Sequence, residues 1–266
     1  IHKHVSPATQ AQALNSVNFL YNKFLNTPTE PIDNFHVATK PTQVPTALTE
    51  REVGLLLNQV PPKMRLPIAL IYGSGLRRIE VARLRIRDID FDNMTLRVWL
   101  CNGANYRTAT LSPAVVEGLK QQIKRAKAVF EKDQSIPCIQ AVPILPVHAK
   151  QYPITASSLE WQYLFPAKRL SIDAESGYSR RHHIDESAIN KCVRKAAKAV
   201  GIDKQVSSHA LRYSFAAHLL ERGADIRDVE EQLGQCNLAT SGMYAHLLQH
   251  RDNQIASPLN NLSVSF

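Results

Sequence analysis

The sequence lacks several features that would assign it to common classes of protein. It has only four cysteines in 266 residues, and no two of them form a Cys-x-x-Cys pair. Neither a zinc site nor a disulfide framework is therefore indicated. No apolar run is long enough to predict a transmembrane helix, and the N-terminus lacks the charged-then-apolar order of a signal peptide. We expect a cytoplasmic protein with reduced cysteines and no membrane partner.

Acidic residues are few relative to basic ones. The 32 Lys and Arg residues against 23 Asp and Glu give a formal net charge of +9. Such an excess indicates a polyanionic partner such as nucleic acid, and a basic protein without such a partner is the alternative. The sequence also has no phosphate-binding Walker loop and no acidic cluster suited to a metal. We therefore expect no cofactor and no metal.

The domain organisation follows from a change in composition. The chain begins at Ile1, inside the approach to a helix, which predicts a fragment of a longer protein. Apolar residues at helical spacing predict a helix within residues 1–26, and the prolines of residues 27–46 predict an extended linker. Thr49-Glu-Arg-Glu52 is a capping-box pattern that begins a helix. We place the main domain at residues 47–266.

The main domain is predicted to be mainly α with a small antiparallel β-sheet, an α+β fold. Alternating residues predict strands at 95–100 and 107–111, joined by an Asn-Gly hairpin turn. Between about 133 and 183 the periodicity is lost, which is typical of a functional insert. The polar tail from about 251 predicts an exposed arm. Helical spacing predicts helices at 64–72, 113–132, 186–200, 211–222 and 225–233.

A histidine and an arginine near the C-terminus have the spacing of a phosphate-binding pair. His209 and Arg212 are three residues apart, so they share one helical face and can converge on one anion. The alternative is an amphipathic helix with an ordinary solvated face. Other motifs favour the first interpretation: Gly73-Ser-Gly75-Leu-Arg77-Arg-Ile-Glu80, Leu233-Gly234-Gln235 and Met243-Tyr244.

With these motifs in this order and spacing, the chain resembles the tyrosine recombinases, the phage-integrase family. The resemblance implies that Arg77 and Arg212 hold the scissile phosphate of DNA, where negative charge develops during cleavage. It implies that Tyr244 is the nucleophile and forms a covalent 3′-phosphotyrosine bond. A phenol of pKa near 10 needs cations and a proton acceptor, which the arginines and His209 provide. Glu80 supports the site, and the enzyme acts on DNA as a homotetramer.

The sequence departs from the family at two catalytic positions. Asn102 occupies the hairpin position where the family has a lysine that acts as general acid, and asparagine cannot donate a proton as an acid. Gln235 stands where the family has His or Trp, although glutamine still donates a hydrogen bond to phosphate. Arg107 is the nearest basic residue in sequence but is a poor acid because its pKa exceeds 12. We expect weakened DNA cleavage.

Within the family the aromatic insert resembles that of integron integrases, which integrate and excise gene cassettes. This resemblance implies that Tyr152, Trp161 and the His182-His183 pair receive bases protruding from folded single-stranded recombination sites, in addition to double-stranded DNA. The alternative is that the aromatic residues anchor a long loop. Arg180 and Arg181 are expected to contact phosphates.

Two other functions remain open from the sequence. The departures at Asn102 and Gln235, together with the missing upstream region, keep open a DNA-binding protein without catalysis. It would be either a decayed recombinase or a regulator that uses the helix-turn-helix-like run of residues 211–233. A type IB topoisomerase would use the same chemistry, but the insert and the chain length do not support it.

Overall fold

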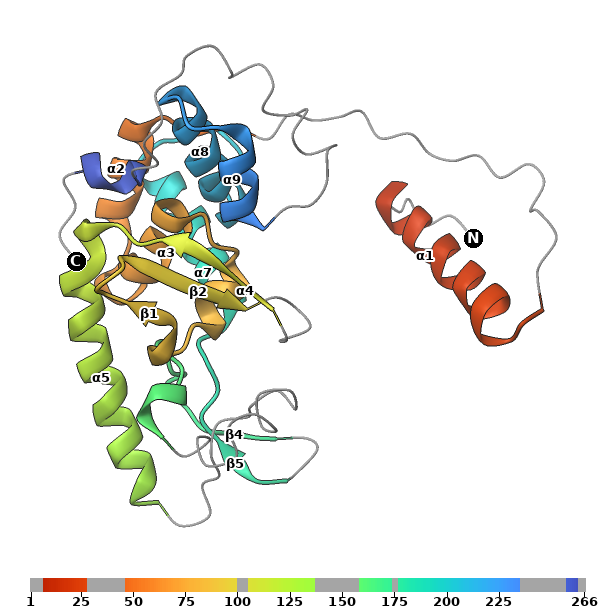
Figure 1. The fold of residues 1–266 in the computed structure, drawn as a ribbon, viewed down its shortest axis with the longest axis horizontal. Helices are drawn as coiled ribbons and strands as arrows, with labels where there is room; N and C mark the ends of the chain where they lie inside the picture. Colours follow the sequence, from red (N-terminus) through yellow and green to blue (C-terminus); the bar gives the residue numbers. More distant parts are fainter. Residues whose placement is uncertain are drawn as a thin grey trace. The chain divides into compact units, whose positions relative to one another are not determined.

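The computed structural model describes residues 7–27, 46–99, 105–136, 158–173, 177–234 and 257–262. The chain divides into two compact units, Ile1–Val44 and Pro45–Phe266. In the first unit, helix α1 (Pro7–Phe19) continues into the π-helical turn η1 (Leu20–Phe24), so the predicted helix is confirmed. The second unit consists mainly of helices with a small antiparallel sheet, as predicted (Figure 1).

Two helices with well-defined ends begin the second unit. Helix α2 (Glu50–Gln59) starts at the predicted capping box, in which the Thr49 hydroxyl accepts from Glu52 N at 3.2 Å and the Glu52 carboxylate accepts from Thr49 N at 2.7 Å. Helix α3 (Pro62–Ser74) follows and is buried from Leu66 to its end. It ends at Gly75, whose φ of +63° suits glycine.

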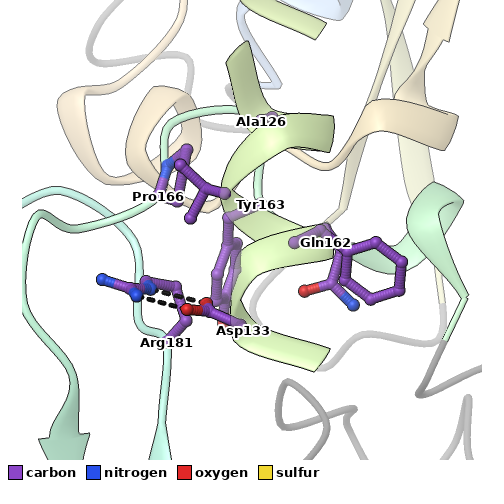
Figure 2. A pocket seen from close by; sticks show the side chains of 8 residues that line it. Ala126, Asp133, Gln162, Tyr163, Pro166 and Arg181 are labelled. Atoms are coloured by element: carbon purple, nitrogen blue, oxygen red, sulfur yellow. Dashed lines mark hydrogen bonds and ion pairs between the residues drawn. The ribbon is translucent and has the colours of Figure 1, made fainter. Parts of the chain in front are cut away.

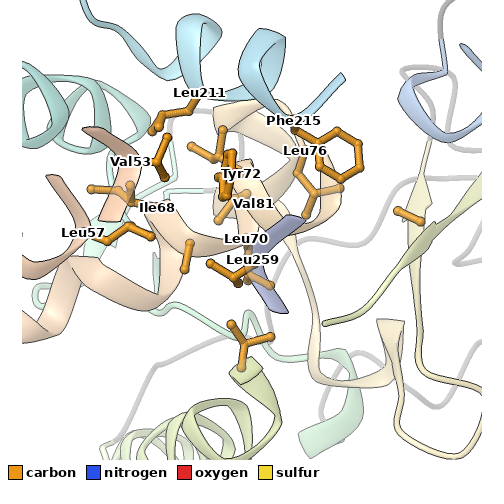
Figure 3. Packing of buried hydrophobic residues seen from close by; sticks show 14 of the residues in the cluster. Val53, Leu57, Ile68, Leu70, Tyr72, Leu76, Val81, Leu211, Phe215 and Leu259 are labelled. Atoms are coloured by element: carbon orange, nitrogen blue, oxygen red, sulfur yellow. The ribbon is translucent and has the colours of Figure 1, made fainter. Parts of the chain in front are cut away.

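Helix α3 lies at the centre of the hydrophobic core. Figure 3 shows side chains of α2, α3 and helix α8 (Ser208–Glu221), among them Val53, Tyr72 and Phe215, packed together. Helix α8 is buried from Ala210 to Leu220, so it has no broad solvated face. It begins earlier than predicted because the Ser207 hydroxyl caps it, accepting from Ala210 N at 3.3 Å. The other helices in the described part of this unit are α4 (Arg78–Arg83), α5 (Val116–Gln134), α7 (Glu186–Ala199) and α9 (Ile226–Leu233).

The predicted hairpin is confirmed as part of a three-stranded sheet. Strands β1 (Ile89–Asp90), β2 (Thr95–Trp99) and β3 (Tyr106–Thr110) pair antiparallel in that order. Strand β3 alternates exposed and buried residues, with Arg107 and Ala109 on the buried side. The turn that carries Asn102 lies outside the described residues.

The described part of the insert is anchored to the main domain. The 3₁₀ turn η5 (Leu159–Trp161) packs against the 3₁₀ turn η2 (Ile86–Asp88), and Leu164 N donates to Leu84 O at 2.8 Å. Strands β4 (Ser171–Ile172) and β5 (Ser179–Arg180) form a small hairpin. These elements are only two or three residues long, which is too short to give the sequence a periodic pattern.

The tail is not an exposed arm at residues 257–262. The 3₁₀ turn η7 (Pro258–Asn261) packs against α3, α8 and the 3₁₀ turn η3 (Pro113–Val115). Leu259 is 1% exposed and belongs to the core, and the Ser257 hydroxyl donates to Gly73 O (Figure 3). The polar composition of the tail gave no sign of this anchoring leucine. The prediction of an exposed arm is therefore wrong for residues 257–262.

Candidate active site

Glu80 is the carboxylate around which the predicted site is assembled. It lies in the first turn of α4, where its Oε2 accepts from the main-chain N–H of Arg77 at 2.7 Å. Its Oε1 accepts from Nη1 of Arg77 at 2.9 Å. Arg77 therefore stands just before the helix, and its backbone and side chain both bind Glu80. The predicted supporting role of Glu80 is in keeping with this geometry.

A second arginine reaches Glu80 from the sheet. Nη1 and Nη2 of Arg107 donate to Oε1 and Oε2 of Glu80, each at 2.8 Å, in a two-point ion pair. Nε of Arg107 donates to the main-chain oxygen of Gln232 at 2.8 Å. The Arg107 side chain is only 7% exposed. Because its donors face Glu80 and Gln232, Arg107 is not placed to act as the missing general acid.

The third arginine comes from the buried helix α8. Nη1 of Arg212 donates to Gly75 O at 2.5 Å, and Nη2 donates to Leu233 O at 2.6 Å. Nη1 of Arg212 also lies 3.7 Å from Glu80 Oε2. The structure thus brings together the predicted residues Arg77, Glu80 and Arg212, which come from positions up to 135 residues apart in the sequence.

The cluster carries an excess of positive charge. Three guanidinium groups surround the single carboxylate of Glu80. Burial opposes ionisation of Glu80, but the hydrogen bonds and charge of Arg107, the Arg77 N–H and the charge of Arg212 outweigh it and lower its pKa. The carboxylate is therefore ionised at neutral pH, and the three guanidinium groups carry two more positive charges than this one carboxylate balances. Arg77, with 36% of its side chain exposed, is the most accessible of the three arginines. Such a site favours a phosphate.

His209 lies at the exposed start of α8, one turn from Arg212. Desolvation of the imidazole, together with the positive charges of Arg78, Arg212 and Arg77, lowers its pKa. The ring is therefore predominantly neutral at pH 7 and is able to accept a proton. Within the described residues, no group of three or more His, Cys, Asp or Glu side chains is arranged to hold a metal ion.

Comparisons with known proteins identify the family of this chain. The Phage integrase family matches residues 46–251. The chain belongs to the phage integrase family. It is 33% identical over 260 residues to an integrase/recombinase of Escherichia coli, covering 98% of this chain and 77% of that protein. It is 31% identical over 237 residues to tyrosine recombinase XerA of Pyrococcus horikoshii, covering 88% and 66%. The predicted resemblance to tyrosine recombinases is confirmed.

Solved structures show the same fold. The site-specific recombinase XerH bound to its difH substrate, in a pre-cleavage complex, matches with a TM-score of 0.59 and 20% identity over 91% of this chain and 63% of that chain. The Tn1549 transposon integrase in complex with transposon right end DNA matches with a TM-score of 0.59 and 19% identity, over 91% and 76%. At these identities the likeness shows the fold alone.

Four predicted residues of this recombinase lie outside the described residues. They are Asn102, Tyr152, Gln235 and the nucleophile Tyr244. Gln235 directly follows Gly234, the last described residue of that segment, and the main-chain oxygen of Gly234 lies 3.5 Å from Nη2 of Arg77. The described segment therefore ends beside the arginine cluster, and Tyr244 follows later in the sequence.

Trp161 does not have the open ring that base stacking requires. It is 1% exposed, the guanidinium of Arg87 lies over its ring at 4.1 Å from the centroid, and Arg85 lies 5.6 Å away. Nη1 of Arg85 also donates to the Trp161 carbonyl. Because the ring is already covered, Trp161 anchors the insert to η2 instead of offering the expected contact with a base.

Other basic residues of the insert are paired within the chain. The guanidinium of Arg181 binds Asp133 of α5, with N–O distances of 2.8 and 2.5 Å, and lines a small pocket with Tyr163 (Figure 2). Arg180 pairs with Asp173 at 3.3 Å. Both arginines thus help to fold the insert, and their expected contact with DNA phosphates stays a prediction.

One of the two predicted histidines, His183, lies against an aromatic residue of the insert, and His182 packs edge-on against His183 with ring centroids 5.9 Å apart. The ring of His183 packs edge-on against Tyr163, with centroids 5.1 Å apart, and its Nδ1 lies 2.7 Å from Ile184 O. Burial lowers the pKa of His183, assisted by the charges of Arg83 and His182. Both histidines are half-buried. Their contact with an unpaired base remains a prediction.

Sequence reasoning missed the position of Arg107. The sequence suggests Arg107 only as a poor substitute acid, whereas the structure places it between Glu80 and Gln232. A signal was available: Arg107 shares the phase of Ala109 and Leu111, both buried, so alternation puts it on the inward face of the strand. A charge on an inward face needs a buried partner.

Proposed function

We propose that the chain catalyses site-specific DNA recombination through Tyr244. The observation that carries this proposal is the cluster of Arg77, Arg107 and Arg212 around Glu80 in a member of the phage integrase family. Membership makes the chain a tyrosine recombinase, and the cluster supplies the excess positive charge that phosphoryl transfer needs.

Each of these groups has a role in the proposed DNA cleavage reaction. The Tyr244 oxygen attacks the phosphorus in line and loses its proton to a base, for which neutral His209 is the candidate. The bond from phosphorus to the 5′-oxygen breaks, and that oxygen must take up a proton to leave as a hydroxyl. Arg77 and Arg212 stabilise the charge on the non-bridging oxygens. In the reverse direction, attack by a 5′-hydroxyl of the partner strand releases the tyrosine, so no ATP is consumed.

The leaving-group step is where this chain is expected to be slow. With Asn102 in place of the lysine and Arg107 bound to Glu80, neither of these two residues can protonate the 5′-oxygen. Loss of a general acid costs about 10²- to 10⁴-fold in rate. We propose a recombinase whose first strand cleavage is impaired for this reason.

A 5′-bridging phosphorothiolate substrate tests this directly, because a thiolate leaves without being protonated. The wild-type protein should form a covalent adduct rapidly on the sulfur substrate and slowly on the oxygen substrate. Asn102→Lys should accelerate only the oxygen reaction. Tyr244→Phe should give no adduct on either. Equal wild-type rates on both substrates would show that an acid is present after all.

The second candidate is a decayed recombinase that binds DNA without cutting it, which the departures at Asn102 and Gln235 favour. Gel-shift binding that is retained without any Tyr244-dependent adduct, even on the sulfur substrate, would establish it.

The resemblance to integron integrases supports more specific proposals about the substrate and the assembly. We propose that the substrates are integron cassette sites, either double-stranded or folded single-stranded, bound by a homotetramer. We also propose that residues 1–26 end a helical DNA-binding domain and that residues 27–46 link it to the catalytic domain. A gel shift that compares a paired duplex with a hairpin carrying unpaired bases tests the substrate preference. The stoichiometry of the retained complex tests the tetramer.

A further inference from the structure

Arg107 links three separate parts of the active site, and we propose that it is a positioning residue for DNA cleavage. It holds the Glu80 carboxylate between the other two arginines and holds the end of α9 against the sheet. This inference rests on the proposed function. Arg107 acts through these groups and does not itself touch the phosphate.

The first link is the two-point ion pair with Glu80. Both oxygens of the carboxylate accept from Arg107 at 2.8 Å, which fixes the plane of the carboxylate as well as its distance. The same two oxygens accept from the Arg77 main chain and side chain. Fixing the carboxylate therefore fixes the guanidinium of Arg77, the most accessible cation of the cluster.

The second link runs to the end of α9. Nε of Arg107 donates to Gln232 O at 2.8 Å, and the side-chain amide of Gln232 donates to the Thr110 hydroxyl of the same strand. The aliphatic stem of Arg107 lies directly beneath Gly234, since a Cβ at Gly234 would lie 2.7 Å from Arg107 Cδ. Gly234 also has a φ of +62°. Two independent constraints thus require glycine where the chain turns toward Gln235.

The third link is the strand itself. Arg107 lies on β3, which pairs with β2 and follows the segment that contains Asn102 in the sequence. One buried side chain therefore joins the hairpin to the Arg77–Glu80 pair and to the segment that leads to Tyr244. Lysine cannot reproduce this, because an ammonium group cannot make the planar two-point contact with Glu80 and the Nε contact at once.

The experiment compares Arg107→Lys and Arg107→Gln with the wild type and with Arg97→Gln. Arg97 lies on neighbouring strand β2, pairs across from Thr108, and is a matched control for loss of one positive charge. We would measure the single-turnover rate of adduct formation at saturating DNA on the sulfur substrate, DNA affinity by gel shift, and amide hydrogen exchange of residues 226–234 without DNA.

Positioning predicts a rate loss without an affinity loss. Arg107→Gln should slow adduct formation by about 10²-fold and Arg107→Lys by about 10-fold, with DNA affinity within twofold of the wild type and faster exchange at residues 226–234. Arg97→Gln should leave the adduct rate and the exchange unchanged. Circular dichroism checks the fold, and Arg107→Lys carries the test if Arg107→Gln does not fold.

Three results would overturn the inference: a rate for the variants within threefold of the wild type, a loss of affinity that accounts for the loss of rate, or unchanged exchange at residues 226–234. If the wild type forms no Tyr244-dependent adduct on the sulfur substrate, the proposed function fails. In that case the amide hydrogen-exchange measurement by itself still tests whether Arg107 orders the end of α9.

Discussion

Gly73 and Leu259 offer a sharp test of how the chain end is held against the core. Gly73 lies near the end of α3, where alanine would be favoured over glycine by about 1 kcal/mol in an open helix. Here a Cβ would lie 2.7 Å from Cδ2 and 3.2 Å from Cβ of Leu259. The contact is too short for a methyl group, so Gly73→Ala must displace η7.

The magnitudes follow from burial. Leu259→Ala removes a side chain that is 1% exposed, which costs about 2.7–5 kcal/mol of unfolding free energy once the cavity is included. Gly73→Ala costs about 1–3 kcal/mol from overpacking, partly offset by helix propensity. In the double variant the new methyl group occupies the space that the leucine leaves. We therefore expect the double variant to be more stable than the sum of the single variants predicts, by about 1–2 kcal/mol.

The assay is urea unfolding followed by tryptophan fluorescence. Both tryptophans, Trp99 and Trp161, lie in the second unit, so the signal reports that unit alone. Gly54→Ala is the matched control, because its Cβ would meet Leu262 at an ordinary 3.8 Å, and it should be neutral or stabilising by up to about 1 kcal/mol. Additivity of the Gly73 and Leu259 effects within about 0.5 kcal/mol would refute the packing argument.

Two further predictions concern buried rings. Trp161→Ala should lower the free energy of unfolding by about 3–5 kcal/mol in a urea titration, whereas Tyr178→Ala, on an exposed residue of the same insert, should change it by less than about 0.5 kcal/mol. The His218 ring, 2.8 Å from the Tyr72 hydroxyl, has its pKa lowered by burial. The unfolded chain therefore takes up the proton first, and stability should fall as the pH falls below about 6.5. His218→Asn should reduce that pH dependence between pH 7.5 and 5.5, and an unchanged slope would exclude His218 as a source, leaving His183 and His209, whose pKa values are also lowered.

Local signals predicted most of the fold because the relevant physics is local. The capping box at Thr49 depends on a few neighbouring residues, and it was confirmed. Motif order also placed Arg77, Glu80 and Arg212 in one site. These residues are recognisable without knowledge of the packing between their elements.

The errors concern contacts between distant segments. The burial of Trp161 depends on Arg85 and Arg87, more than 70 residues earlier, and no pattern within the insert reveals that contact. The docking of Leu259 likewise depends on the space above Gly73. In both places a surface role was predicted for a side chain that the structure buries in the core.

Arg212 has a structural consequence beyond its proposed role in phosphate binding. The two carbonyls that accept from it, Gly75 O and Leu233 O, stand at the C-terminal ends of α3 and α9. One guanidinium thus caps two helices, satisfying carbonyls that lack intrahelical donors and opposing the negative ends of both helix dipoles. Replacing Arg212 would loosen two helix ends as well as the site. A folded but inactive protein for DNA-binding studies is therefore better made by removing the Tyr244 hydroxyl than by changing Arg212.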